Sequence, residues 1–496
     1  MRKMVYGMKR IRLVAFALAF CILIGCSKTE DSLPHTAKLS AVVSVTGDVA
    51  NAFNLESFNK FTVSQVKYDS ESFDCISLGD VISEAGVLGE DCSVFLSAPD
   101  GVMAQIPIDQ AMDCYLTLRD ERGWECIAPY HPPQVNIKRI DQIVVCAQEP
   151  SENSGVRFIM AKTTFAVSYG DLFASQGEEH VILEGSPIVK KNDLEFNANA
   201  YSRRTLIPIK NFTEQDGTAK AYFGDGSEGL IEQSGYIEWR GNSADYIAPN
   251  RRNRMKDIIC VWVDAPEYSI TDVAANVLKV LEQDEKVMLI ELDGAGWQAI
   301  EYAKAQNRIP FLSGYSAQPI STVYPCISNV ALASLLTGQT PDKTTVTQRS
   351  ERILQVDDIF NIAAQSGKTG TVIEGNSKLV DMSIQQLLNV DTNENGSTDD
   401  EVFACAKKQL GKFDFTFVHF HGIDDTAHTY GPFSQQSLDK LSEIDGFIQA
   451  LCIGFDGTII ITADHGQHDV QSETKSGDHG TFNVQDMIVP LIEIKQ

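Results

Sequence analysis

The segment KVMLIELDG, residues 286–294, decides the fold class of the carboxyl-terminal part of the chain. It is a short and nearly continuous apolar run that ends in Asp293 and Gly294, which is typical of a strand buried on both faces. Similar strand-like segments and helical patterns alternate after it. The strand-like segments are 367–375, 413–420 and 457–466, and the helix-like segments are 297–306, 330–338, 400–410 and 437–451. This alternation predicts an α/β domain over residues 285–496, with a mostly parallel sheet between two layers of helices.

Acidic residues lie at or just beyond the ends of three predicted strands. Asp293 ends the first strand, Asp424 follows the segment 413–420, and Asp464 follows the run at 458–462. The carboxyl ends of parallel strands meet at one edge of a sheet, which is where α/β proteins bind ligands. Three carboxylates at one edge repel one another unless a cation neutralises them. The pattern therefore predicts a metal site.

Histidines accompany these acids. His428 lies four residues after Asp424, His465 is adjacent to Asp464, and His479 follows in the segment GDHG. Asp and His in sets of three or four suit Zn²⁺, with Mn²⁺ and Fe as alternatives. Taken singly, each residue also has a structural explanation, because an Asp can cap a helix and a His can be hydrogen-bonded in the core or at the surface. Their order and their places at strand ends favour metal binding.

This order of motifs resembles the alkaline phosphatase superfamily, nearest to its type I phosphodiesterase and nucleotide pyrophosphatase branch. The resemblance rests on Asp293, YPCISNVALASLLTG at 324–338, Asp-x-x-x-His-x-x-Gly-Pro at 424–432, and the two segments DHG at 464–466 and HG at 479–480. It implies an alkaline-phosphatase-like fold and two divalent metal ions, with Zn²⁺ expected and Mn²⁺ as the alternative.

The resemblance also implies which residues bind each ion. One ion would be held by Asp424, His428 and His479, and the other by Asp293, Asp464 and His465. His419, His421, Asp425 and His468 are neighbours, which either support these ligands or belong to solvated loops.

The family's nucleophile is a Ser or Thr three residues after a proline, which implies Ser328 after Pro325. Ser328 precedes an apolar helical run that is closed by Gly338, and the free N–H groups at a helix start favour an alkoxide and an incoming phosphate. A simple capping role for Ser328 is the alternative. The expected roles are nucleophile and metal ligand for Ser328 and donation to a phosphate oxygen for Asn329.

The amino terminus has the pattern of an export signal. Residues 1–25 contain five Lys and Arg followed by an apolar run at 13–25, and LIGC at 23–26 resembles the lipobox of bacterial lipoproteins. This implies a signal peptide over 1–25, lipidation of Cys26, a linker over 26–40 and an extracytoplasmic protein anchored in a lipid bilayer of the cell envelope. A single uncleaved anchor is the alternative.

The net charge limits the partners. It is −26 at pH 7 for the whole chain, and it becomes −31 without residues 1–25, which carry five basic and no acidic residues. Such a field repels nucleic acid, so we expect none as a partner. A small phosphate ester could approach where bound metal overrides this field. Nine cysteines remain after Cys21 and Cys26, without a CxxC motif, and their pairing stays open.

Residues 41–150 and 151–265 are each predicted to form a β-rich mixed domain. The second is a candidate repeat of the first, since IAPYHPPQVNIKRIDQIVVC at 127–146 has a counterpart in IAPNRRNRMKDIICV at 247–261. The first also resembles the molybdopterin-binding domain of sulfite-oxidase-type proteins, but no cysteine between 41 and 150 has the arginine-cysteine context of that family. A docking or spacer domain is the alternative. In the last domain, NVDTNENGSTDDE at 389–401 is either a calcium loop or a solvated acidic turn.

These features predict metal-dependent hydrolysis of phosphoric esters, specifically phosphodiesters or nucleotide pyrophosphates, through a phosphoseryl intermediate. One alternative is transfer of a phosphoryl or phosphoethanolamine group to an envelope glycan. Another is a cell-surface binding protein whose hydrolase core is degenerate. The oligomeric state stays open.

Overall fold

The computed structural model describes residues 42–495, apart from residues 121, 153, 162, 186, 187, 192, 193, 198, 214 and 215. The chain divides into a unit of residues 1–40 and a unit of residues 41–496, and the second contains all the described helices and strands. The predicted signal segment, Cys26 and the linker therefore lie outside the described residues. Within the described ranges, no helix is long and apolar enough to cross a membrane.

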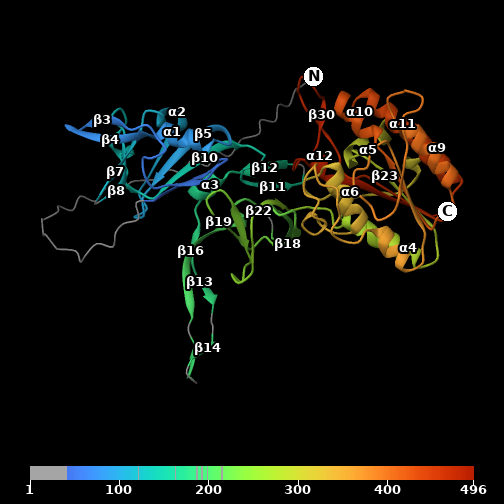
Figure 1. The fold of residues 1–496 in the computed structure, drawn as a ribbon, viewed down its shortest axis with the longest axis horizontal. Helices are drawn as coiled ribbons and strands as arrows, with labels where there is room; N and C mark the ends of the chain where they lie inside the picture. Colours follow the sequence, from blue (N-terminus) through green and yellow to red (C-terminus); the bar gives the residue numbers. More distant parts are fainter. Residues whose placement is uncertain are drawn as a thin grey trace, which may run out of the picture. The chain divides into compact units, whose positions relative to one another are not determined.

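The first β-rich domain contains two five-stranded sheets (Figure 1). Their strand orders are β2–β1–β10–β5–β6 and β3–β4–β7–β8–β9. The strands are β1 (Val43–Gly47), β2 (Phe53–Leu55), β3 (Ser64–Tyr68), β4 (Glu71–Ser77), β5 (Gly89–Ser97), β6 (Met103–Pro107), β7 (Tyr115–Arg119), β8 (Gly123–Ile127), β9 (Lys138–Ile140) and β10 (Gln142–Pro150), with helices α1 (Leu78–Ala85) and α2 (Ile108–Ala111) and the 3₁₀ turn η1 (Pro133–Val135). Ser77 caps α1 by accepting from the N–H of Asp80.

The second β-rich domain also contains two five-stranded sheets, with orders β12–β11–β22–β17–β18 and β13–β16–β19–β20–β21, and the separate hairpin β14–β15. Its elements are β11 (Val156–Met160), β12 (Thr163–Val167), α3 (Tyr169–Ala174), β13 (Glu178–Gly185), β14 (Ile188–Lys191), β15 (Leu194–Asn197), β16 (Ala200–Pro208), η2 (Ile209–Asn211), β17 (Thr218–Phe223), β18 (Glu228–Glu232), β19 (Tyr236–Trp239), β20 (Ala244–Ile247), β21 (Arg254–Met255) and β22 (Ile258–Trp262).

The two β-rich domains share one topology. In each, the first strand runs parallel to the last, as β1 to β10 and β11 to β22, and the neighbouring pairs in that sheet are antiparallel. The two Ile-Ala-Pro segments occupy equivalent places, because Ile127 ends β8 and Ile247 ends β20. We infer that the segments are a structural repeat, with α3 and the β14–β15 hairpin as additions in the second copy.

The carboxyl-terminal domain is built on a seven-stranded sheet of order β24–β31–β28–β23–β27–β25–β26. The strands are β23 (Val287–Leu292), β24 (Ala317–Ser321), β25 (Gly370–Glu374), β26 (Gln386–Leu388), β27 (Phe415–Phe420), β28 (Thr458–Thr462) and β31 (Ile488–Lys495). The five strands from β28 to β26 are parallel, whereas β31 and β24 add antiparallel pairs at one edge. The predicted mostly parallel sheet is confirmed, and the antiparallel edge is an addition to it.

Helices pack against this sheet in two groups. The helices α4 (Thr271–Leu281), α6 (Ser328–Thr337) and α8 (Ile359–Gln365) contact one another or the sheet, and a second group contains α9 (Asp399–Gln409), α10 (Gly422–Tyr430) and α11 (Gln435–Ile453). In Figure 1 these groups lie on opposite sides of β23. The remaining helical elements are α5 (Trp297–Ala305), η3 (Leu312–Gly314), α7 (Pro341–Thr344) and α12 (Val484–Met487), and β29 (His468–Asp469) pairs with β30 (Gly477–Asp478). Every residue of β23 and β27 is buried, as expected for strands covered on both faces.

Candidate metal centre

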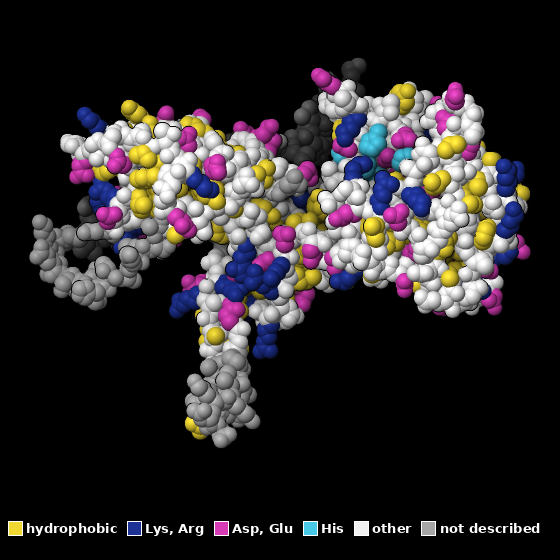
Figure 2. All heavy atoms as spheres, viewed as in Figure 1, with side chains coloured by type: hydrophobic (Ala, Val, Ile, Leu, Met, Phe, Trp, Pro, Cys, Tyr) yellow, Lys and Arg dark blue, Asp and Glu magenta, His cyan; other side chains and the backbone are white. Residues whose placement is uncertain are grey.

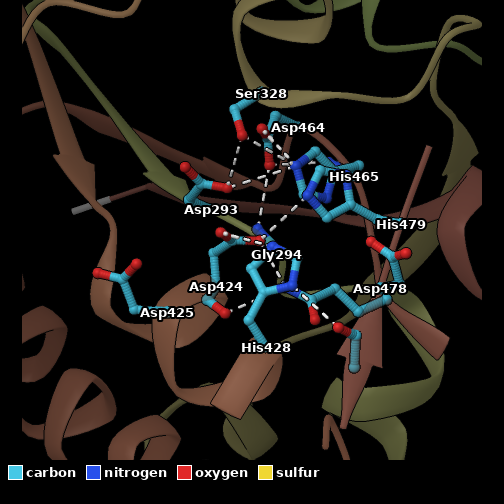
Figure 3. A network of polar contacts seen from close by, with 12 residues as sticks. Asp293, Gly294, Ser328, Asp424, Asp425, His428, Asp464, His465, Asp478 and His479 are labelled. Atoms are coloured by element: carbon cyan, nitrogen blue, oxygen red, sulfur yellow. Dashed lines mark hydrogen bonds and ion pairs between the residues drawn. The ribbon is translucent and has the colours of Figure 1, made fainter. Parts of the chain in front are cut away.

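The predicted ligands lie at the carboxyl edge of the parallel strands. Asp293 directly follows β23, and Asp464 follows β28 by two residues. Asp424 and His428 lie on α10, which begins two residues after β27 ends. Residues four apart on a helix lie on the same face, so α10 presents both side chains in one direction. Figure 3 shows these residues converging with His465, His479 and Ser328.

Asp293, Asp464 and His465 form the first ligand set. The Nε2 atom of His465 lies 3.5 Å from Oδ1 of Asp293 and 3.3 Å from Oδ2 of Asp464. All three side chains are buried, and Oδ2 of Asp464 has no hydrogen-bond donor among the described residues. These atoms lie close enough together to bind one ion.

Asp424, His428 and His479 form the second set. The Nε2 atom of His428 lies 3.4 Å from Oδ2 of Asp424, and that of His479 lies 3.7 Å from Oδ1 of the same carboxylate. A tetrahedral ion with ligand bonds of about 2.0–2.1 Å holds neighbouring ligand atoms about 3.3–3.4 Å apart. The spacings in both sets are near this value, so these residues fit the two divalent ions that the sequence predicts.

The histidine rings are held in the orientation that metal binding needs. Backbone carbonyl groups accept from Nδ1 of all three rings: that of Gly477 from His428 at 2.9 Å, that of Gly466 from His465 at 3.1 Å, and that of Cys326 from His479 at 3.0 Å. A ring that donates from Nδ1 keeps its lone pair on Nε2. Nε2 is the atom that faces the carboxylates in each set.

The electrostatics of the centre favour a bound cation. Burial raises the pKa of Asp424 and of Asp464 well above the usual range, and the negative charge of Asp293 acts in the same direction. Burial also lowers the pKa of His465 to about 4 and that of His479 to about 2. Both rings are therefore neutral at pH 7 and available as ligands, and a cation bound beside Asp424 and Asp464 would favour the ionised forms of these two buried acids.

Gly294 fixes the distance between two of the strands. Its N–H donates to Oδ1 of Asp464 at 3.1 Å, and its φ of +74° lies in the left-handed region. A Cβ atom at this position would lie 3.0 Å from Cα and Oδ1 of Asp424. The position therefore requires glycine, and it brings Asp293, Asp424 and Asp464 together.

Ser328 is the first residue of α6, and it does not cap this helix. The N-cap is Ile327, and there is no side-chain capping bond. The Oγ atom of Ser328 instead lies 3.2 Å from Nε2 of His465 and 3.4 Å from Oδ1 of Asp293. The hydroxyl is thus beside the first ligand set and at the amino end of a helix.

Asn329 is oriented differently from the prediction. Its amide nitrogen donates to the carbonyl oxygens of Gln348 at 2.9 Å and of Glu351 at 2.7 Å. Both N–H groups are used by this loop, so the expected donation from Asn329 to a phosphate oxygen does not agree with the structure.

A family comparison gives the same result as the geometry. Residues 374–490 match the family described as type I phosphodiesterase / nucleotide pyrophosphatase. Over these residues the carboxyl-terminal domain is similar to that family, and we refer to it as the phosphodiesterase-like domain. This confirms the resemblance that the motifs indicated, and the matched range contains all the predicted ligands except Asp293 and Ser328.

Among curated proteins, a part of the chain is similar to the catalytic subunit of GPI ethanolamine phosphate transferase 3 from Homo sapiens and from Mus musculus. Each is 35% identical over 72 residues, which is 14% of this chain and 6% of the relative. The match thus spans a small part of those proteins.

Similar solved structures include a phosphonoacetate hydrolase from Sinorhizobium meliloti 1021, in complex with phosphonoformate, with 16% identity and a TM-score of 0.33. The alignment covers 38% of this chain and 58% of that chain. Murine ectonucleotide pyrophosphatase / phosphodiesterase 5 is 11% identical with a TM-score of 0.35, and the alignment covers 42% of this chain and 88% of that chain.

The neighbours His419, His421, Asp425 and His468 lie around the ligands of the phosphodiesterase-like domain. Nε2 of His419 and Nδ1 of His421 contact Oδ2 of Asp293 at 3.3 and 2.5 Å, so the second oxygen of Asp293 faces away from Ser328. Asp425 is exposed, and Figure 3 shows it pointing away from the other ligands. His468 pairs with Asp486 at 2.7 Å, and Asp486 also accepts from Thr481 in the loop that carries His479.

Three further residues contact the ligands and were not predicted. Gln467 is buried and donates to the backbone carbonyl of Asp424 at 3.2 Å, and Glu291 accepts from the N–H of Asp464 at 3.1 Å. Arg349 approaches His479 from a loop. Glu291 could have been noticed, because it is an acidic residue within the otherwise apolar run of β23. Gln467 and Arg349 belong to no periodic pattern or motif that would have pointed to the site.

The acidic segment 389–401 forms a turn before α9. The side-chain oxygens of Asp391 and Asn395 accept from the N–H groups of Gly396 and Ser397, both at 2.8 Å. Among the described residues, no group of candidate metal ligands includes this turn.

Proposed function

We propose that this protein is a metal-dependent hydrolase of phosphoric esters in which Ser328 is the nucleophile. The observation that carries this proposal is the position of Oγ of Ser328, 3.2 Å from His465 and 3.4 Å from Asp293, at the uncapped amino end of α6. Free N–H groups and the positive end of the helix dipole favour the alkoxide and the incoming phosphate.

The reaction is an in-line displacement at phosphorus in two halves. Ser328 Oγ forms a bond to phosphorus while the bond to the alcohol or phosphate leaving group breaks, which gives a phosphoseryl enzyme. Water then forms a bond to phosphorus, the serine–phosphorus bond breaks, and the hydroxyl is restored. Before the reaction, the contacts with Asp293 and His465 place the serine hydroxyl beside the first ligand set.

Divalent ions bound by the two ligand sets would neutralise phosphate charge and favour the ionised hydroxyl. The chain itself holds the ligands in place through the Nδ1 hydrogen bonds of its histidines and the N–H of Gly294. Phosphodiesters and nucleotide pyrophosphates are the proposed substrates, because the family match is to enzymes described by those activities.

The test is turnover of a nitrophenyl phosphodiester by the zinc-loaded protein. Ser328→Ala should lower kcat by more than about a thousandfold while metal content stays as in wild type, since the nucleophile alone is lost. The control is Ser334→Ala on the same helix, where the buried hydroxyl has no hydrogen-bond partner among the described residues. Wild-type turnover by Ser328→Ala would exclude Ser328 from the role, and absence of both metal and turnover in the wild type would favour a binding protein with a degenerate core.

A transferase is the second candidate, and the similarity to GPI ethanolamine phosphate transferase 3 favours it. Transfer uses the same first half-reaction, after which a glycan hydroxyl replaces water as the acceptor. Product release in the presence and absence of a sugar acceptor separates the two reactions, because a hydrolase needs only water.

We also propose that the protein is anchored at the extracytoplasmic face of a membrane through lipid on Cys26. The support is the sequence of residues 1–26 alone. Mass spectrometry of the amino-terminal peptide after expression in a bacterium tests it, since an unmodified Cys26 in a membrane-free protein would contradict it.

A further inference from the structure

A cationic side chain contacts one of the predicted metal ligands. Arg349 lies on the loop between α7 and α8, and its Nη2 atom is 3.4 Å from Nε2 of His479. This nitrogen of His479 is the one that faces the second ligand set. Arg349 is exposed, whereas His479 is buried, so this contact joins a solvent-accessible cation to a buried ligand. Figure 2 shows histidines at the surface of this domain with Lys and Arg side chains beside them.

The loop that carries Arg349 is fixed to the helix of the proposed nucleophile. Asn329 follows Ser328 in α6 and is buried. Its amide nitrogen donates to the carbonyl oxygens on both sides of Arg349, those of Gln348 and Glu351. The position of Arg349 is therefore tied to the position of Ser328 through one side chain.

Hydrogen bonds within the loop also hold its residues together. The carboxylate of Glu351 accepts from the backbone N–H of Thr347 at 2.6 Å and from that of Gln348 at 3.2 Å. These hydrogen bonds lower the pKa of Glu351, so it is ionised at neutral pH. The result is a compact turn with Arg349 between its anchored residues.

We propose that Arg349 binds the non-bridging oxygens of the phosphoryl group and that Asn329 positions it for this contact, an inference that rests on the proposed function. A guanidinium group is planar, always charged and able to donate two parallel hydrogen bonds to phosphate oxygens. The site also needs a local positive charge, because the net charge of the chain, −26, repels an anionic substrate.

Non-bridging oxygens are shared by substrates and by inorganic phosphate, whatever the leaving group. Inorganic phosphate is therefore the probe, and its dissociation constant for the zinc-loaded protein is measured by calorimetry. Arg349→Ala should weaken phosphate binding by about 10- to 100-fold, with unchanged zinc content. Arg349→Lys should recover part of this loss of affinity, since lysine keeps the positive charge but lacks the two parallel N–H donors of a guanidinium group.

Arg352→Ala is the matched control. Arg352 lies three residues further along the same loop, but its guanidinium donates to the carbonyl of Lys378 and not to a metal ligand. Removal of this charge should leave phosphate binding within about twofold of wild type, because exposed charges at longer range are screened by salt. An equal loss of phosphate affinity in Arg349→Ala and Arg352→Ala would show that any nearby positive charge has the same effect. This result would overturn the proposal.

A double-mutant cycle tests Asn329 as a positioning residue. Asn329→Ala should weaken phosphate binding in the wild-type background and have little further effect in the Arg349→Ala background. Equal effects in both backgrounds would overturn the positioning role, and wild-type phosphate affinity in Arg349→Ala would overturn the proposal itself. Because phosphate binding needs no turnover, these outcomes stand apart from the Ser328→Ala test of the proposed function.

Discussion

The imidazole rings of His465 and His479 stack on one another, with ring centroids 3.8 Å apart and 13° between the ring planes. The two residues belong to different ligand sets, so the two sets are in direct contact through these rings (Figure 3). Two ions, one bound by each set, would therefore lie near each other. One phosphoryl group could then contact both sets and Ser328 at the same time, which is the arrangement that in-line displacement requires.

Asp424→Asn should remove one of the two ions. Asp424 contacts both histidines of the second set, at 3.4 and 3.7 Å, and a neutral amide binds a divalent cation far more weakly than a carboxylate does. We expect zinc content to fall from about two to about one per chain and kcat/KM to fall by at least about a hundredfold. Elemental analysis together with turnover of a nitrophenyl ester measures both effects.

Asp425→Asn is the control for this variant, because Asp425 is adjacent in sequence but exposed. It should keep both ions and most of the activity. Equal zinc loss in the two variants would contradict the assignment of Asp424.

Gly294→Ala should disturb the centre through the backbone. Alanine at a φ of +74° is strained, and its Cβ would contact Asp424 at 3.0 Å. We expect a loss of about 1–3 kcal/mol in the free energy of unfolding and weaker zinc binding. Gly314→Ala is the control, since a Cβ there would meet no atom within 4 Å. Unchanged zinc affinity in Gly294→Ala, measured by competition with a chelator, would contradict this role.

Glu374 should make the stability of the metal-free protein depend on pH. It is fully buried, both its carboxylate oxygens lack hydrogen-bond partners among the described residues, and burial raises its pKa to about 8. The folded state therefore keeps this proton to a higher pH than the unfolded state, so its contribution to stability is present below about pH 4.5 and is lost as pH rises to about 8.

Glu374→Gln removes this titration, and the variant should lose less stability between pH 5 and pH 8 than wild type does. Urea unfolding in the presence of a chelator measures the difference, whose slope is at most about 1.4 kcal/mol per pH unit. Glu473→Gln, at an exposed position, is the control. Parallel pH profiles for wild type and Glu374→Gln would show that Glu374 does not titrate in this range.

The parts of the site that could be predicted from sequence are those that strands place. Asp293 and Asp464 follow buried apolar strands, and parallel strands bring their carboxyl ends to one edge without further information. His428 was found through its spacing from Asp424. Both residues lie on the helix α10, where a spacing of four places their side chains on one face.

The role of Asn329 was not predictable from its place beside Ser328. Neighbouring residues on a helix point about 100° apart, so a helix that turns Ser328 toward the ligands turns Asn329 elsewhere. Its amide reaches the loop at Gln348 and Glu351 instead. Arg349 and Gln467 were not predicted because they lie on loops. The conformation of a loop produces no hydrophobic periodicity in the sequence from which their positions could be inferred.

We expect two cations to bind the acids and histidines that surround the hydroxyl of Ser328 in the phosphodiesterase-like domain. Anomalous diffraction from crystals of the zinc-loaded protein, measured at the zinc absorption edge, tests it most directly. We expect two peaks in each chain, one among Asp293, Asp464 and His465 and the other among Asp424, His428 and His479. A lack of peaks at these residues, or zinc bound only at other surfaces of the molecule, would contradict it.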